Sequence, residues 1–233
     1  MTERKTALIF GGSRGIGAAA AEALAREGYE VGVTFVNAAP AGAKRAYKAD
    51  LRDAASVVAA FDAFAAECGA PDCVVANAGI NVPPGPLAAF DPARFRDLVE
   101  TNIVGAFNML SAAASRVKDG GAIIALTTSL VRHAAPGLGP YSATKAAVES
   151  LVRSLQKELA GRGVRVNAVA PGPVDTDLFR AGKDEAALAR SAAMSPFNRV
   201  GRPEEVAEVI AFLASPRSSW IAGQIIQPNG GLV

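Results

Sequence analysis

The chain has few of the residues on which disulfide scaffolds and metal centres depend. Two cysteines, Cys68 and Cys73, and one histidine, His133, occur among the 233 residues. Neither cysteine has metal-ligand neighbours in the sequence, so both are predicted to be reduced thiols and no metal site is expected. No apolar run approaches the roughly 18 residues of a membrane-spanning helix, and the N-terminus does not resemble a signal peptide. A cytoplasmic location without membrane association is therefore expected.

An excess of charge of one sign is also missing. The 24 Lys and Arg residues nearly balance the 22 Asp and Glu residues, and no block of like charge occurs. A nucleic-acid partner is therefore not expected. Hydrophobic residues make up 50% of the chain and charged residues 20%, which is typical of a globular protein. The length suits one α/β domain over residues 1–233.

The first pattern with chemical content is a strand, a glycine turn and a helix. Apolar residues 6–10 predict a strand, Gly11, Gly15 and Gly17 follow, and an alanine-rich helix continues to about residue 27. Glycines let the backbone approach a pyrophosphate closely, and a helix N-terminus offers free N–H groups. The alternative is a glycine-rich turn that binds nothing, but the flanking strand and helix favour a dinucleotide.

The end of the second predicted strand, residues 30–36, bears on which dinucleotide is bound. A site specific for NAD places a carboxylate there, about 20 residues past the glycines. This chain has Asn37 instead, and no carboxylate before Asp50. Together with Arg14 inside the glycine loop, this favours the 2′-phosphate of NADP(H), with NAD(H) still possible. The competing interpretation is that Arg14 is a solvated loop cation.

Strands alternate with helices to the C-terminus. Residues 38–45 are too few for a full crossover helix, so a loop or a single turn is expected there. The order predicts one doubly wound parallel sheet, a Rossmann fold of about seven strands with a shortened second crossover. An irregular helical stretch over residues 177–195 could cover a pocket. The other predicted strands are 46–49, 71–76, 122–128, 164–170 and 224–227, and the other helices are 54–67, 91–118, 141–160 and 203–214.

Tyr141 and Lys145 lie four residues apart at the start of a predicted helix, so their side chains share one face. A phenol has a pKa of about 10, and a nearby cation lowers it toward the range of general acid–base catalysis. Thr128 and Ser129 add two hydroxyls upstream. The same spacing is common on ordinary helix surfaces, which is the competing interpretation.

In this order and at these spacings, the motifs resemble the short-chain dehydrogenase/reductase family over essentially the whole chain, including its 3-oxoacyl-carrier-protein reductase-like members. This resemblance implies an oxidoreductase that interconverts a ketone and a secondary alcohol. The alternative is a non-catalytic dinucleotide-binding regulatory or scaffold protein. The resemblance rests on Gly11-x-x-x-Gly15-x-Gly17, Asn77-Ala78-Gly79, Asn102, Thr128 and Ser129, Tyr141-x-x-x-Lys145, Pro171-Gly172 with Val174 and Thr176, Arg199 to Glu205, and Gly230-Gly231.

The resemblance also implies a role for each catalytic residue. Tyr141 would donate the proton in reduction, and Lys145 would bind the nicotinamide ribose and lower the pKa of Tyr141. Asn102 would hold a water molecule for proton relay. Either Ser129 or Thr128 would bind the substrate oxygen, and Ser129 is preferred because a primary hydroxyl fills less space. The hydride would come from the coenzyme.

The coenzyme is expected to lie along the carboxyl ends of the strands. The resemblance implies that the glycines contact the pyrophosphate, that Asp50 and Leu51 lie at the adenine, and that Val174 and Thr176 hold the carboxamide. The predicted coenzyme-binding residues are Gly11, Ser13, Arg14, Gly15, Ile16, Gly17, Asn37, Asp50, Leu51, Asn77, Ala78, Gly79, Tyr141, Lys145, Pro171, Gly172, Val174 and Thr176.

Three further expectations follow from the resemblance and its departures. Phe10 stands where the family usually has a threonine that braces the glycine turn, so a slightly different turn is expected. Arg132 and His133 border the pocket, where they could contact a substrate, an anionic one in the case of Arg132, or form a solvated loop pair. A homotetramer or homodimer is expected, built partly through the helices around 91–118 and 141–160.

Overall fold

In the computed structural model, which describes residues 4–233, seven strands form one sheet in the order β3-β2-β1-β4-β5-β6-β7. Every neighbouring pair is parallel. The predicted doubly wound fold is confirmed. The strands are β1 (Thr6–Phe10), β2 (Glu30–Phe35), β3 (Ala46–Lys48), β4 (Cys73–Ala76), β5 (Ala122–Leu126), β6 (Arg165–Val169) and β7 (Ile225–Ile226).

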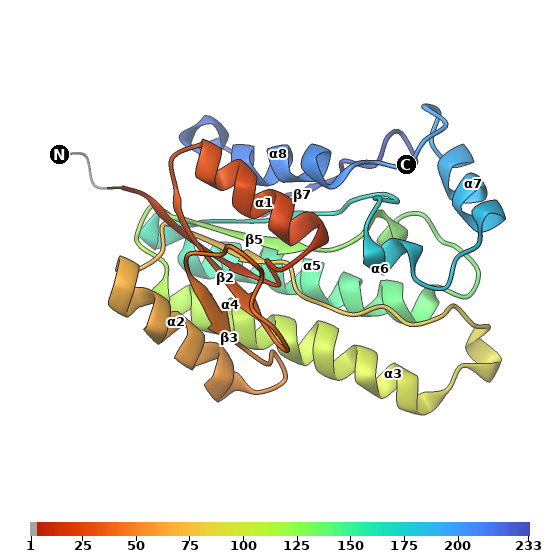
Figure 1. Ribbon diagram of the computed structural model, residues 1–233, viewed down its shortest axis with the longest axis horizontal. Coiled ribbons are helices and arrows are strands. Elements are labelled where there is room, and N and C mark those ends of the chain that lie inside the picture. The colour runs from red at the N-terminus through yellow and green to blue at the C-terminus, as the bar shows by residue number, and fades with distance from the viewer. Residues whose placement is uncertain (1–3) are drawn as a thin grey trace.

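The helices cover both faces of this sheet (Figure 1). Helices α1 and α8 pack on one face, and α2, α4 and α5 pack on the other, so the sheet separates two apolar cores. Strands β1, β4 and β5 are buried along their whole length, which explains their continuous apolar sequences. The helices are α1 (Gly15–Arg26), α2 (Ala54–Cys68), α3 (Pro92–Val99), α4 (Gly105–Arg116), α5 (Gly139–Leu159), α6 (Asp177–Arg180), α7 (Glu185–Ala193) and α8 (Pro203–Ala214).

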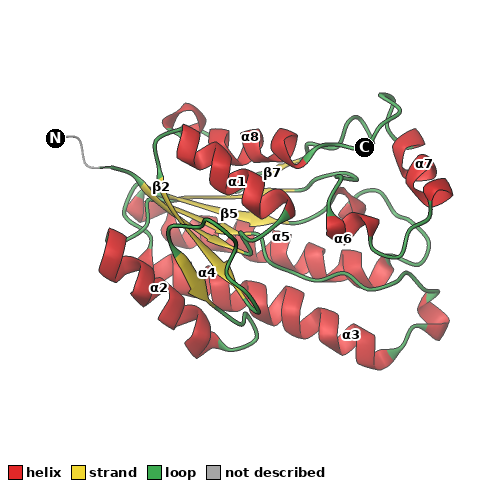
Figure 2. Ribbon diagram, viewed as in Figure 1, coloured by secondary structure: helices red, strands yellow, loops and turns green. Residues whose placement is uncertain are grey.

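The connection from β2 to β3 contains no helix, as the short sequence predicts (Figure 2). The predicted helix 91–118 is divided, because a five-residue π-helix, η2 (Glu100–Val104), separates α3 from α4. A π-turn often marks a functional site, and Asn102 lies within this one. The stretch over residues 177–195, for which irregular helical structure is expected, contains the short helices α6 and α7. No helix in the described part of the chain is long and apolar enough to cross a membrane.

The strand order reverses between β1 and β4, because the chain builds outward from β1 to β2 and β3 and then continues from β4 on the other side. In open α/β sheets, ligands bind outside the carboxyl ends of the strands at this switch point. The loops that follow β1, β2, β4 and β5 therefore hold the candidate site.

Candidate active site

The turn between β1 and α1 requires glycine at specific positions. Gly11 has φ +77° and Gly15 has φ +55°, a backbone conformation that L side chains rarely adopt. A Cβ on Gly17 would lie 2.1 Å from the carbonyl oxygen of Gly11, and a Cβ on Gly11 would lie 2.7 Å from the Cβ of Ala78. The turn is thus closed so tightly that only glycine fits, and its backbone forms an open cradle in front of the α1 N-terminus.

A hydroxyl from the neighbouring strand braces this turn. Phe10 points into the core, where its ring centroid lies 5.2 Å from that of Phe61, and it cannot brace anything. Thr34 in β2 accepts a hydrogen bond from the Gly11 N–H at 3.1 Å, and the Asn77 amide donates to the Gly11 carbonyl at 2.8 Å. The expected difference in the turn is therefore a brace from β2. Thr34 is not among the predicted site residues, although a polar residue inside an apolar strand was an available signal.

A cleft of about 850 Å³ opens beside this turn, at the carboxyl ends of the strands. It brings together twelve of the predicted coenzyme residues. The remaining six predicted residues, which include Tyr141 and Lys145, are not among its lining residues. The twelve lining residues are Gly11, Ser13, Arg14, Gly15, Ile16, Asn37, Asp50, Leu51, Asn77, Ala78, Gly79 and Thr176.

The two arginines of the cleft differ in their partners. Arg52 donates from Nε and Nη2 to the two carboxylate oxygens of Asp50, at 3.0 and 2.7 Å, and these hydrogen bonds hold the pKa of Asp50 below its usual range. Arg14 is exposed at the N-cap of α1, and within residues 4–233 its guanidinium has no ion-pair or hydrogen-bond partner. Arg14 is therefore the cleft cation that is free to meet an anionic group.

Asn102 is an interior hydrogen-bonding residue and not a surface one. Its side chain is 1% exposed, its Oδ1 accepts from the Ile80 N–H, and its Nδ2 donates to the Ile80 carbonyl, both at 2.9 Å. Nδ2 also lies 3.3 Å from Thr144 Oγ1 on α5. Asn102 thus ties the loop after β4 to the helix that carries Tyr141.

Lys145 reaches the cleft wall from the second turn of α5. It is buried, its Nζ donates to the Leu126 carbonyl at 3.0 Å, and a Cβ on Gly79 would lie 3.3 Å from that Nζ. Because Gly79 lines the cleft, the ammonium stands directly behind the cleft surface. Burial lowers the pKa of Lys145 to about 8.

The phenol of Tyr141 does not have the lowered pKa that the sequence predicts. Burial raises the pKa of Tyr141 to about 12. Lys145 donates to Leu126, and in the described chain no hydrogen bond joins the two side chains. The loss of water around the phenol therefore dominates, and Tyr141 keeps its proton at neutral pH.

Comparison with known proteins agrees with this geometry. A family profile described as Enoyl-(Acyl carrier protein) reductase matches residues 11–233. An NADPH-dependent aldehyde reductase-like protein of Arabidopsis thaliana is 37% identical over 98% of this chain and 94% of its own length. The 3-oxoacyl-acyl-carrier-protein reductase FabG of Staphylococcus aureus is 36% identical over 100% and 99%. A short chain dehydrogenase of Burkholderia cenocepacia, solved in complex with NADP, has a TM-score of 0.89 and 32% identity over 98% of this chain and 97% of its own.

The chain belongs to the short-chain dehydrogenase/reductase family. It is thus a member of an oxidoreductase family, and its fold matches those of solved short-chain dehydrogenases closely.

The two hydroxyls that the sequence offers, Ser129 and Thr128, differ in their partners in this short-chain dehydrogenase/reductase. Ser129 is completely buried, and its Oγ already donates to the Ala170 carbonyl at 2.7 Å. The Thr128 hydroxyl accepts from the Leu130 N–H at 3.3 Å, which leaves its own proton free to donate. The Ser129 hydroxyl is thus tied to the end of β6, whereas the Thr128 hydroxyl has no acceptor for its proton among the described residues.

Arg132 has an ion-pair partner that the sequence did not indicate. Its Nη1 contacts both carboxylate oxygens of Glu149, at 3.0 and 3.1 Å, and Glu149 is buried on α5. The side chain thus points to an interior partner and not to a solvated neighbour. Glu149 is not among the predicted site residues, because an acidic residue on a helix is ordinarily solvated.

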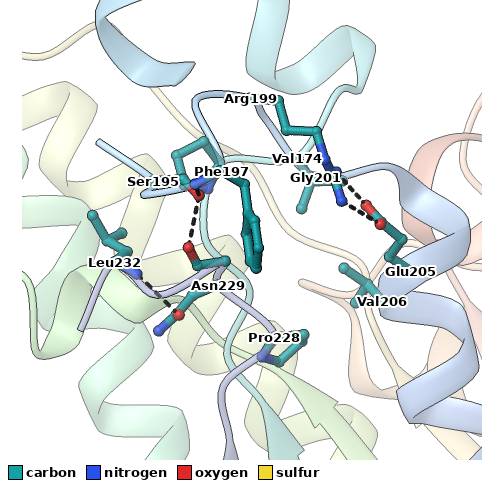
Figure 3. Close-up of a pocket in the computed structure, with 12 residues that line it drawn as sticks. Val174, Ser195, Phe197, Arg199, Gly201, Glu205, Val206, Pro228, Asn229 and Leu232 are labelled. Atoms are coloured by element: carbon teal, nitrogen blue, oxygen red, sulfur yellow. Dashed lines mark hydrogen bonds and ion pairs between the residues drawn. The ribbon is translucent and has the colours of Figure 1, made fainter. Parts of the chain in front are cut away.

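A second, smaller pocket of about 190 Å³ lies between the segment before α8 and the C-terminal tail (Figure 3). Its walls are joined to one another: Ser195 donates to the Gly230 carbonyl, and Arg199 pairs with Glu205 through both oxygens. Val174 lines this pocket and not the larger cleft. Of the two residues expected at the carboxamide, only Thr176 lines the cleft.

Proposed function

We propose that this protein is an NADP(H)-dependent oxidoreductase that interconverts a ketone and a secondary alcohol. The observation that carries the proposal is the position of Tyr141 and Lys145 on the opening turns of α5, with the Lys145 ammonium directly behind Gly79 on the wall of the glycine cleft. This arrangement sets a proton donor and a cation beside a site shaped for a dinucleotide.

The cleft residues fit a dinucleotide phosphate. The cradle of Gly11 and Gly17 leaves no room for a Cβ, as a pyrophosphate site requires, and the α1 N-terminus adds N–H groups. The unpaired guanidinium of Arg14 suits a 2′-phosphate. The Arabidopsis relative is NADPH-dependent by name and the Burkholderia structure holds NADP, which supports the same coenzyme here. When bound, NADPH supplies the hydride.

The protein supplies the proton and the orientation. Because its pKa is about 12, the Tyr141 phenol is protonated at neutral pH and is ready to donate to the substrate oxygen in reduction. We assign the second contact with that oxygen to the Thr128 hydroxyl, whose proton is uncommitted. Asn102 keeps the loop after β4 at the helix that carries Tyr141 and Lys145.

The test is NADPH oxidation by the purified protein across a panel of ketones, diketones and 3-oxoacyl thioesters, with NADH in parallel. Turnover of at least one carbonyl is expected, faster with NADPH than with NADH. Tyr141→Phe should abolish turnover while leaving NADPH binding intact, because it removes only the proton donor. If the wild-type protein binds NADPH and Tyr141→Phe changes no measurable property of it, the protein is a dinucleotide-binding regulator and the proposal fails.

The assembly stays a prediction. Phe95 on α3 and Phe107 on α4 expose 41% and 54% of their surface, on the helices through which a homotetramer or homodimer is expected. Light scattering coupled to size exclusion would give the mass of the particle. A monomer at micromolar concentration would contradict the expectation.

A further inference from the structure

Glu149 is a carboxylate in an unusual place. It lies one helical turn beyond Lys145 and two beyond Tyr141 on α5, so all three share one face of the helix. Its side chain is 3% exposed. Acidic side chains are almost never this buried unless they are paired, because removing a charge from water is costly. The groups that face it should therefore explain its presence.

Those groups all lie on the loop after β5 or on α5 itself. Arg132 Nη1 contacts both carboxylate oxygens at 3.0 and 3.1 Å. The Thr127 hydroxyl lies 3.4 Å from Oε1 and 3.4 Å from the Val169 carbonyl oxygen, so its one proton is shared between these two acceptors. Arg153, one turn further along α5, lies 3.8 Å from Oε2 and is mostly exposed. Thr127 and Arg132 stand on either side of Thr128. One buried carboxylate therefore holds both ends of the segment that carries the substrate-binding hydroxyl.

The same segment is tied on its other side to β6. The Thr127 N–H donates to the Val169 carbonyl at 2.8 Å, the Ser129 N–H to the Pro171 carbonyl at 2.9 Å, and the Ser129 hydroxyl to the Ala170 carbonyl. These bonds attach the segment to the sheet. The contacts of Glu149 attach it to α5, the element that carries the proton donor.

We propose that Arg132 and Glu149 are positioning residues for the reaction: their ion pair sets the Thr128 hydroxyl relative to the Tyr141 phenol. This inference rests on the proposed reductase function and deepens it. Neither residue touches the reacting atoms. Their effect is to hold the Thr128 hydroxyl, on the loop after β5, and the Tyr141 phenol, on α5, at positions from which both reach one substrate oxygen.

The experiment compares kcat, KM and thermal unfolding for four forms: wild type, Arg132→Lys, Arg132→Met, and the double variant Arg132→Met with Glu149→Leu. The single Met variant leaves a buried carboxylate without its main partner and is expected to be destabilised. Replacing both partners by apolar residues restores stability, because buried ion pairs are often replaceable in this way. Stability and positioning are thereby separated.

The double variant should fold with wild-type stability but lose between about tenfold and a hundredfold in kcat, since small displacements of catalytic groups cost that much. Its KM for the carbonyl and its NADPH affinity should stay unchanged. Arg132→Lys should retain most of kcat, because a single nitrogen, Nη1, makes both contacts and an ammonium can reproduce them. The control is Arg26→Met with Glu208→Leu, an exposed pair between α1 and α8 that should leave kcat unchanged.

Three results would overturn the inference. A double variant with wild-type kcat would make the pair merely structural. A rise in KM confined to anionic substrates, with kcat unchanged, would assign Arg132 to substrate binding. A wild-type protein without turnover on any carbonyl would refute the proposed function itself and this inference with it, and that result is distinguishable because it appears before any variant is made.

Discussion

Replacing Lys145 by Met tests how far burial controls the chemistry of this site. Lys145 is buried beside Gly79, and burial lowers its pKa from the usual 10.5 to about 8. Below pH 8 the ammonium is charged in both the folded and the unfolded protein, so the folded state bears the full cost of burying it. Met fills similar space without a charge, so the variant is relieved of that cost.

The magnitude follows from the two pKa values. Their difference, at about 1.36 kcal/mol per pKa unit, corresponds to about 3 kcal/mol. Between pH 8 and pH 10.5 the unfolded state binds more protons at this lysine than the folded state, so the stability of the wild type rises with pH in this window. The Met variant has no ionisable group at this position and therefore lacks this pH-dependent contribution to stability. Its stability relative to the wild type should therefore fall by about 3 kcal/mol from pH 7 to pH 10.5.

Urea unfolding of both proteins at a series of pH values measures this difference, since groups that titrate in both proteins cancel. Lys157→Met, which removes an exposed lysine from the same helix, is the matched control for a lysine that bears no burial cost. The Lys145 variant should also lose turnover. The charge whose removal stabilises the protein is the charge that the proposed reaction needs.

One result would refute the reasoning. If the stability difference between the Lys145 variant and the wild type were the same at pH 7 and pH 10.5, the lysine would have an ordinary pKa in the folded protein. The burial argument, which also sets the pKa of Tyr141, would then be wrong.

Three further predictions concern the coenzyme cleft. Arg14→Gln should raise the Kd of NADPH about ten- to a hundredfold, because a charge-assisted hydrogen bond is lost. The Kd of NADH should stay unchanged in the same fluorescence titration. Gly17→Ala should abolish NADPH binding, because its Cβ would meet a backbone oxygen at 2.1 Å, whereas Gly161→Ala, in open space, should bind normally. Thr34→Val should cost about 1–3 kcal/mol in urea unfolding, because a turn N–H loses its acceptor, and Thr34→Ser should restore it.

Much of the fold was predictable because its signals are local. Each signal lies within one stretch of chain: the continuous apolar runs, the glycine turn, and the short length of the segment 38–45. The seven-stranded parallel sheet confirms the fold that they predict. The π-helix at Asn102 was not predictable, since the residues around it have ordinary helical character and only contact with Ile80 distinguishes it.

The pKa of Tyr141 depends on an effect that local reasoning does not include. Spacing predicts that Lys145 and Tyr141 share one helix face, and they do lie on α5. Spacing does not reveal that Lys145 donates to the Leu126 carbonyl or that burial raises the pKa of the phenol. Desolvation depends on the assembled core, so the direction of the Tyr141 pKa shift could not be obtained from the helix alone.

The sequence by itself determined the sheet, the glycine cradle, and the residue types of the proton donor and its cation, because these depend on neighbours within a few positions. Only the tertiary structure decided that Thr34 braces the turn in place of a residue at position 10, that Ser129 is tied to Ala170, and that Arg132 meets Glu149. These partners are 23, 41 and 17 positions apart. Hydrogen bonds and ion pairs of that range form only when the packed strands and helices bring their side chains together.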